Sequence, residues 1–425
     1  MQHSDQLKRG PGSKAISKIA FSVPEKYELN SGIDLYSIRT PGIGALKFEI
    51  VFEAGRLYES KNLVAQCCAG LLSEGCKGWN SSELSEAFDF EGAYLSTYGN
   101  SDFITVRLTC ATKSFSKLLK ILGQIIAHPA FSEEELEIFA SRKKQKMAVN
   151  LTKNDVISYR AITEGIYGPK SPYGYNSLPE MLDSIKSEDI HDHYKKSCIS
   201  QSAHFFLSGD FNEGHLKEID NLSNIVLKKE IAKIEYSKTQ TTKKEVILKG
   251  RENQSSLRLG IPLFSRQNKD YPKIYLLNTI LGGYFGSRLM KNIREEKGYT
   301  YNIYSMLDTH KYDGAWIISC ELDEKYVSST IKEIENEFER LKQEKLDEGE
   351  LEMVKNYLMG NFMNTINGPL KSINPYKTEI IMGLENSFYN SLSEQILSFS
   401  AEDIRVYAQE YLNIDNFWRV IVGKA

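Results

Sequence analysis

Residues 131–144, FSEEELEIFASRKK, return in altered form at residues 346–359, LDEGELEMVKNYLM. The shared Glu-Leu-Glu core begins at Glu135 in the first copy and at Glu350 in the second, 215 residues later. Each copy starts with acidic residues and continues with apolar residues at helical spacing, which is typical of the first turns of an amphipathic helix. The pair therefore suggests that one structural unit occurs twice in this chain.

Two further pairs of segments support the duplication. SIKSEDIHDHYKK (184–196) matches SFSAEDIRVYAQE (398–410) at an offset of 214 residues. Another match, of SAHFFLSGDF with NFWRVIVGKA, places Gly209 and Gly423 the same 214 residues apart. Three matches in one order at nearly one offset indicate an internal repeat, and each repeat should have the same plan.

Each repeat contains segments in which apolar and polar residues alternate and β-branched and aromatic residues are frequent. That pattern predicts β-strands. The predicted strands are IDLYSIRT (33–40), ALKFEIVFEAG (45–55), DFITVRLTC (102–110) and HFFLSG (204–209) in the first repeat, and KEVILKG (244–250), SSLRLGIPL (255–263), GAWIISCEL (314–322) and WRVIVG (418–423) in the second.

Amphipathic segments at 133–153 and 324–344 predict long helices, and Ser187 and Ser400 are expected to be the N-caps of each repeat's last helix. Strands and helices in separate blocks favour an α+β class, with two homologous α/β sandwiches, each a mainly antiparallel sheet covered by helices. The expected organisation is a first domain at 1–215, a linker at 216–244 and a second domain at 245–425.

Composition excludes several classes of function. The 425 residues carry a net charge of -3, from 53 basic and 56 acidic side chains, which argues against nucleic acid or an anionic membrane as the main partner. No apolar run approaches the ~20 residues that span a bilayer. The N-terminus lacks the apolar core of a signal peptide, so we expect a cytoplasmic protein, or a periplasmic one if a leader has been removed.

Three segments carry a resemblance to a known family. They are FEAGRLYE (52–59), EGAYLSTYGNSDFITVRLTC (91–110) and LGGYFGSRLMKNIREEKGYTYNIYS (281–305). Together with the duplication, they resemble the M16 metallopeptidase family, the pitrilysin and insulinase group that includes the mitochondrial processing peptidase. The resemblance covers nearly the whole chain and implies the metallohydrolase fold of that peptidase.

Active members of this family carry His-x-x-Glu-His on the helix that follows the first segment. Histidines at i and i+4 share one helix face and can hold one zinc ion, and the glutamate is the general base for the zinc-bound water. A later helix supplies a third ligand, a glutamate. By resemblance, the corresponding positions in this chain are Gln66 and Gly70 for the histidines, Ala69 for the base and Met147 for the third ligand.

A shifted alignment does not restore these groups. There is no histidine between His3 and His128, and there is no carboxylate from Ile138 to Asn154. We therefore expect no metal and no other cofactor in this chain.

Other side chains offer no replacement site. Cys67 and Cys68 are adjacent, so on a helix they point ~100° apart and cannot both face one ion. All six cysteines are better explained as small buried hydrophobic residues, because none has CxxC spacing. His191 and His193 are at positions i and i+2, do not share a helix face, and are expected on a solvated surface.

The second repeat resembles the family more closely. By resemblance, Arg294 and Tyr301 are the pair that reaches a substrate at a zinc site on a facing lobe. A guanidinium can hold a substrate carbonyl or carboxylate, and a phenol can donate a hydrogen bond to an oxyanion. The glycine-rich loop is the expected substrate-binding segment, with Gly282, Gly283 and Gly286 permitting backbone conformations that other residues avoid, and with Tyr284 and Phe285 between them.

A phosphate-binding loop is disfavoured, because no Gly-Lys-Ser/Thr follows these glycines and the preceding segment is expected to be helical. The favoured interpretation is therefore a non-catalytic, substrate-binding subunit of a two-chain zinc peptidase. Its partner would be an M16 chain that carries His-x-x-Glu-His and the zinc, and its substrate an unfolded peptide or small protein.

Two alternatives remain open. The chain could be an inactive M16-fold scaffold or peptide-binding protein, or a stand-alone enzyme that uses other groups. No Ser/His/Asp or Cys/His set can be assembled from the sequence in support of the stand-alone enzyme.

Overall fold

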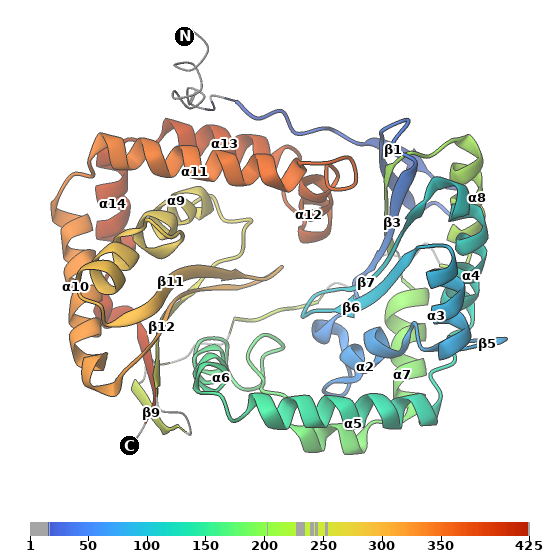
Figure 1. Cartoon of the computed structure of the whole chain (residues 1–425), viewed down its shortest axis with the longest axis horizontal. Helices are drawn as coiled ribbons and strands as arrows, with labels where there is room; N and C mark the ends of the chain where they lie inside the picture. The colour runs from blue at the N-terminus through green and yellow to red at the C-terminus, as the bar shows by residue number, and fades with distance from the viewer. Residues whose placement is uncertain are drawn as a thin grey trace, which may run out of the picture.

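The computed structural model describes residues 16, 18–201, 203–226, 234–238, 242, 245–250 and 254–423. Each half of the chain forms a β-sheet that is covered by helices, and the two halves face each other across the molecule (Figure 1). The α+β class is confirmed.

The first sheet has six strands in the order β1-β2-β8-β3-β7-β6. Neighbouring strands are antiparallel except for the parallel pair of β2 and β8. The strands are β1 (Glu25–Glu28), β2 (Asp34–Arg39), β3 (Ala45–Phe52), β6 (Tyr94–Gly99), β7 (Ile104–Ala111) and β8 (Ala203–Gly209).

The second sheet has five strands in the order β11-β12-β10-β13-β9. Here the pair of β13 and β9 is parallel and the other pairs are antiparallel. Reversed, the order β9-β13-β10-β12-β11 reproduces β2-β8-β3-β7-β6 of the first sheet, so the duplication is confirmed at the level of topology. The strands are β9 (Glu245–Lys249), β10 (Ser255–Leu263), β11 (Thr300–Thr309), β12 (Gly314–Leu322) and β13 (Trp418–Gly423).

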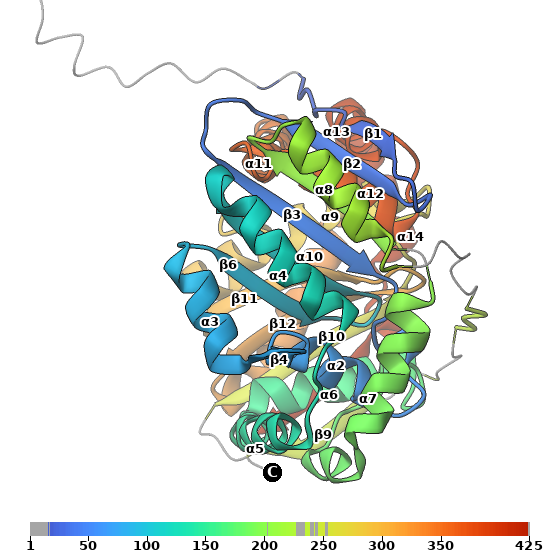
Figure 2. The same ribbon diagram turned by 90° about the vertical axis from the view of Figure 1, so that its right-hand side faces the viewer.

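Helices cover both sheets, and Figure 2 shows α4 and α8 on either side of strand β3. In the first half they are α2 (Val64–Leu71), α3 (Ser81–Phe90), α4 (Phe115–Ala127), α5 (Glu133–Asn150), α6 (Asn154–Tyr167), α7 (Ser187–His193) and α8 (Glu213–Ser223). In the second half they are α9 (Tyr271–Gly282), α10 (Val327–Gln343), α11 (Glu348–Ile366), α12 (Asn374–Met382), α13 (Phe388–Ser398) and α14 (Ala401–Tyr411). In the part of the chain that the structure describes, no helix is long and apolar enough to cross a membrane.

The repeated segment that opened the sequence analysis begins α5 and α11. Ser132 Oγ accepts a hydrogen bond from the Glu135 amide at 3.2 Å, and Asp347 Oδ1 accepts one from the Gly349 amide at 2.9 Å. Both helices are therefore capped by a side chain at the same repeat position. Ser400 likewise caps α14, but Ser187 does not cap α7, because it lies inside that helix and its hydroxyl donates to the Phe131 carbonyl instead.

Each half lends one helix to the inner face of the other half's sheet. From the first half, α6 packs Ile162 and Ile166 against Trp418 and Val420 of β13. From the second half, α12 brings Met382 to the first sheet. Figure 1 shows α6 and α12 in the central region, between the two sheets. This exchange joins the halves through apolar cores that neither half completes alone.

The linker expected at 216–244 begins with a helix. Leu216, Ile219 and Leu222 of α8 are buried in the first core, so the first half extends at least to Val226 and the expected linker starts too early. Parts of the expected linker lie outside the described residues. Within the described part, Tyr236 OH donates to Asp313 Oδ2 at 2.7 Å, which attaches this segment to the second half.

Candidate functional site

The helix in the expected zinc-binding position is α2, and its N-terminus is held by Glu59. Glu59 Oε2 accepts a hydrogen bond from the Ala65 amide at 3.2 Å, and Tyr175 OH donates to Glu59 Oε1. Leu63, just before the helix, has a left-handed φ of 75°. The FEAGRLYE segment therefore has a structural function that sequence reasoning missed, because the capping carboxylate lies six residues before the amide it accepts from.

The interior of α2 is packed against its neighbours. A Cβ atom on Gly70 would lie 2.3 Å from Phe139 Cε2 of α5, so the Phe139 ring occupies the space beside this position. Ala69 is 2% exposed, and its Cβ lies against Gly99 of β6. Gln66 is half-buried, and Met147 packs on the edge of the first core. None of these four positions therefore has a histidine or a carboxylate: Gln66 has an amide, and the other three residues make apolar contacts.

The cysteines behave as apolar side chains, as predicted. All six are buried and have free thiols. Burial raises the pKa of Cys67 and of Cys110 to about 12, so neither thiol is a ready metal ligand at neutral pH. Across the described residues, His, Cys, Asp and Glu do not form a group of three or more that could hold a metal ion.

The two histidines of the HDH segment differ in environment. His193 is 4% exposed and its Nε2 lies 2.8 Å from the Ala54 carbonyl oxygen, so the expected solvated surface is wrong for this residue. Burial lowers the pKa of His193. His191 is exposed and packs edge-on against Phe131. His193 therefore joins the helix to the lead-in segment rather than forming a site.

The structure brings Arg294 and Tyr301 to the same hollow, which has a volume of about 690 Å³. Arg294 lies on η5 (Met290–Glu296), a π-helical turn, and Tyr301 lies near the start of β11. The register of β11 on β12 shifts between Thr300 and Ile303, and this bulge projects Tyr301 outward, leaving it 86% exposed. The pair is thus available to a molecule that approaches from outside.

The glycine-rich loop supplies an aromatic partner for Arg294. The Arg294 guanidinium lies 4.5 Å from the centre of the Phe285 ring, a cation–π distance, and Phe285 is 63% exposed. Tyr284 packs instead on Tyr357 of α11, with ring centres 4.9 Å apart. Of the two aromatic residues in the loop, Phe285 is therefore the one that lies beside the Arg294 side chain.

Close packing explains the glycines of this loop. A Cβ on Gly282 would lie 2.7 Å from Ser305 Cβ, and a Cβ on Gly283 would lie 2.7 Å from Thr279 Cα. Gly283 has a φ of -84°, which any residue can adopt. The expectation that glycine supplies an unusual backbone conformation is therefore wrong at Gly283, where the close approach of the chain excludes a side chain.

Two duplicated α/β sandwiches define the fold class, and comparisons with known proteins identify the family. Residues 37–164 match the family described as "Insulinase (Peptidase family M16)", and residues 184–358 match "Peptidase M16 inactive domain". The chain belongs to peptidase family M16.

Relatives span almost the same length as this chain. The "Non-peptidase homolog YmxG" of Helicobacter pylori is 24% identical over 88% of each protein. The "Uncharacterized zinc protease YmxG" of Bacillus subtilis is 20% identical over 87% of this chain and 91% of its own length. A crystal structure of a peptidase M16 inactive domain from Pseudomonas fluorescens has a TM-score of 0.85 at 19% identity, over 95% of this chain and 98% of that one. The chain is thus an M16-fold protein with relatives named as lacking peptidase activity.

Proposed function

We propose that this chain is the non-catalytic, substrate-binding subunit of a two-chain M16 zinc peptidase. The observation that carries the proposal is the placement of Arg294 and Tyr301 at one open hollow. In the same chain, Gly70 faces the Phe139 ring where a zinc ligand would be needed. A chain that offers substrate-contacting residues but lacks the zinc ligands fits a two-chain enzyme in which the other chain binds the zinc.

In this proposal the zinc belongs to a partner that carries His-x-x-Glu-His. Arg294 holds a carbonyl or carboxylate of an unfolded peptide or small protein. Tyr301 donates its phenolic hydrogen to the oxyanion of the tetrahedral intermediate, a contact whose loss typically lowers the rate by roughly 10²–10³-fold. The exposed Phe285 ring lies against Arg294 and offers an apolar surface to the substrate.

Peptide hydrolysis by this chain, by the partner and by their mixture tests the proposal. We expect only the mixture, and neither chain by itself, to hydrolyse the peptide. The pair should contain about one zinc ion, and this chain by itself should contain no stoichiometric zinc. Tyr301→Phe should lower kcat of the mixture by roughly 10²-fold, because the oxyanion loses a donor. Arg294→Ala should lower kcat/KM in the same assay.

Matched controls are Tyr94→Phe and Arg405→Ala. Tyr94 is 65% exposed on the edge strand β6, and Arg405 pairs with Glu402 on the surface of α14. Both controls should retain the rate of the mixture. If the Arg294 and Tyr301 variants were as active as these controls, the two side chains would have no function in hydrolysis. Peptide binding without hydrolysis by the mixture would favour the alternative of an inactive peptide-binding protein.

A further inference from the structure

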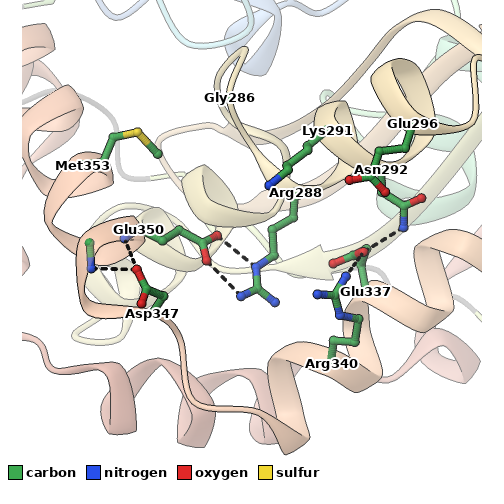
Figure 3. A pocket seen from close by; sticks show the side chains of 11 residues that line it. Gly286, Arg288, Lys291, Asn292, Glu296, Glu337, Arg340, Asp347, Glu350 and Met353 are labelled. Atoms are coloured by element: carbon green, nitrogen blue, oxygen red, sulfur yellow. Dashed lines mark hydrogen bonds and ion pairs between the residues drawn. The ribbon is translucent and has the colours of Figure 1, made fainter.

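A second hollow lies on the other side of η5 from Tyr301. Its volume is about 500 Å³. Lys291, Asn292 and Glu296 of η5 line it, whereas Arg294 and Glu295 line the hollow of the proposed function. Arg288, Arg340, Glu337, Asp347 and Glu350 also line it, so its wall carries charges of both signs (Figure 3). Nothing in the proposed function uses this hollow.

The charged groups of this hollow hold one another in fixed positions. The guanidinium of Arg288 donates from Nε and Nη2 to the two carboxylate oxygens of Glu350, both at 3.0 Å. Glu337 Oε1 accepts from Asn292 Nδ2 at 2.7 Å and from Arg340 Nη1 at 2.9 Å. Such charge-assisted and bidentate contacts restrict the side chains, so that the remaining polar atoms have defined directions.

Three polar atoms of these same side chains stay without a partner. Within the described residues, Arg288 Nη1, Asn292 Oδ1 and Glu337 Oε2 are buried and make no hydrogen bond to the protein. Glu337 is 1% exposed, and Figure 3 shows its carboxylate and the Arg288 guanidinium directed into the same hollow. Buried polar groups in folded proteins are nearly always hydrogen-bonded, so this set calls for a partner from outside the chain.

Three of the eleven buried side-chain atoms that lack a hydrogen-bond partner in the described parts of the chain belong to residues that line this hollow. Ser287, next to Arg288, and Thr330, two turns before Glu337 on α10, also have unpaired buried hydroxyls, but neither residue lines the hollow.

The chemistry of the three atoms selects the ligand. Glu337 Oε2 is a charged acceptor that suits an ammonium group, and Asn292 Oδ1 is a second unpaired acceptor among the lining residues. Arg288 Nη1 is an unpaired donor, Lys291 also lines the hollow, and these cationic groups suit a carboxylate. A simple anion would face the Glu337 carboxylate, and a simple amine would leave Arg288 unsatisfied. We propose that this hollow binds a small zwitterion, either a free α-amino acid or a short peptide with both termini unblocked.

Binding to the isolated chain, measured by calorimetry, tests this proposal independently of any peptidase partner. The probes are L-alanine, Ala-Ala, N-acetyl-Ala-Ala and Ala-Ala amide, of which the last two lack the ammonium and the carboxylate respectively. We expect at least one unblocked probe to bind and each blocked dipeptide to bind about 10-fold or more weakly than Ala-Ala, because a charged hydrogen-bond partner is left unpaired. Comparison of L-alanine with Ala-Ala shows whether the hollow takes amino acids or peptides.

Glu337→Gln tests the residue assignment, and Glu335→Gln is its matched control. Both remove one carboxylate from α10, but Glu335 is exposed, lies two residues before Glu337 and does not line the hollow. We expect at least a 10-fold loss of affinity for the first variant and none for the second. If Glu337→Gln does not fold, the blocked probes on the unaltered chain still decide. Equal affinity for blocked and unblocked dipeptides, or no binding of any probe at millimolar concentration, overturns the proposal.

Discussion

Gly70 stands where the family resemblance would place a zinc ligand, and here the position serves the packing of two helices instead. The Phe139 ring of α5 lies where any side chain at residue 70 would have to begin. The close contact fixes the spacing of α2 and α5, and it also excludes a histidine at this position without movement of the ring. The position is therefore constrained by packing, since an imidazole would need more room than the methyl group that already fails to fit.

Gly70→Ala is expected to destabilise the protein by about 1–3 kcal/mol, because the new methyl group would overlap the Phe139 ring. Phe139→Ala in the same chain should remove most of this additional cost, so that the two changes are not additive. Urea denaturation of the two single variants and the double variant measures the coupling.

Gly360→Ala is the control for this cycle. Gly360 lies within α11, and a Cβ atom there would meet nothing within 4 Å. Alanine should stabilise the helix at that position by up to about 1 kcal/mol. If Gly70→Ala stabilised the protein as much as Gly360→Ala, the Phe139 ring would not restrict the side chain at residue 70.

At the scale of elements, the exchanged helices α6 and α12 matter most. Ile162 and Ile166 belong to the first repeat in sequence, yet their contacts are with β13 of the second. The hydroxyls of Ser158 on α6 and Ser256 on β10 lie 2.8 Å apart, which adds a buried polar contact to the apolar ones. A helix held in this way should unfold together with the sheet that it covers, rather than with its own repeat.

Ile162→Ala should lower the free energy of unfolding by about 2–5 kcal/mol, because it opens a cavity at a fully buried site. Ile138→Ala on α5 is the matched control, since Ile138 is 38% exposed. It should cost less than about 1 kcal/mol, because substitutions on the surface usually change the free energy of unfolding by only ~0.5 kcal/mol. Thermal or urea unfolding of the three proteins gives both values. A cost at Ile162 no larger than that at Ile138 would contradict the packing of α6 on the second sheet.

At the scale of the whole molecule, ion pairs connect the halves around two buried carboxylates. Lys377 of α12 lies 2.9 Å from Glu49 of β3, and Lys311, between β11 and β12, lies 2.6 Å from Glu53. Burial alone would raise the pKa of each glutamate. For Glu49 the charges of Lys377 and Lys47 outweigh burial, and for Glu53 the neighbouring His204 ring, 3.5 Å away, and the Lys311 charge do so. The pKa of each falls from 4.5 to about 2. The ionised carboxylates therefore stabilise the closed arrangement.

Stability should fall in acid as a result. A carboxylate with a depressed folded-state pKa stabilises the protein fully above its unfolded pKa, here near 4.5, and this contribution is lost as the pH falls towards about 2. The loss should be on the order of 3 kcal/mol for each of the two glutamates. Urea denaturation at a series of pH values measures it.

Glu49→Gln should flatten the pH dependence between pH 4.5 and about 2, because the titrating group is removed. The same variant should be less stable than the parent at neutral pH, since Lys377 and Lys47 lose their buried partner. Glu335→Gln, an exposed change on α10, should leave the slope as it is. An unchanged slope in Glu49→Gln would exclude Glu49 as the group that titrates.

Local pattern was sufficient for eight strands and for the duplicated plan, because alternation reports which face of a strand is buried, but it did not predict β1, β6 or β11. Local pattern failed at α8, where a Lys-, Thr- and Ser-rich background concealed Leu216, Ile219 and Leu222 at helical spacing. At His193 it failed because burial there depends on a carbonyl 139 residues away. Arg294 and Tyr301 were found from family resemblance, and the bulge that exposes Tyr301 required the pairing of β11 with β12.

The sequence by itself determined that this protein is two copies of one α/β unit, and that histidine and glutamate are missing from the positions that resemble the zinc motif. Both properties are carried by residue identity and by spacing within a few turns of chain. Only the tertiary structure decided that α6 and α12 cross to the opposite sheets, that Phe139 occupies the space beside Gly70, and that Arg288 and Glu337 share a hollow. These contacts join segments tens to hundreds of residues apart, and apolar periodicity shows that a face is buried without showing which surface buries it.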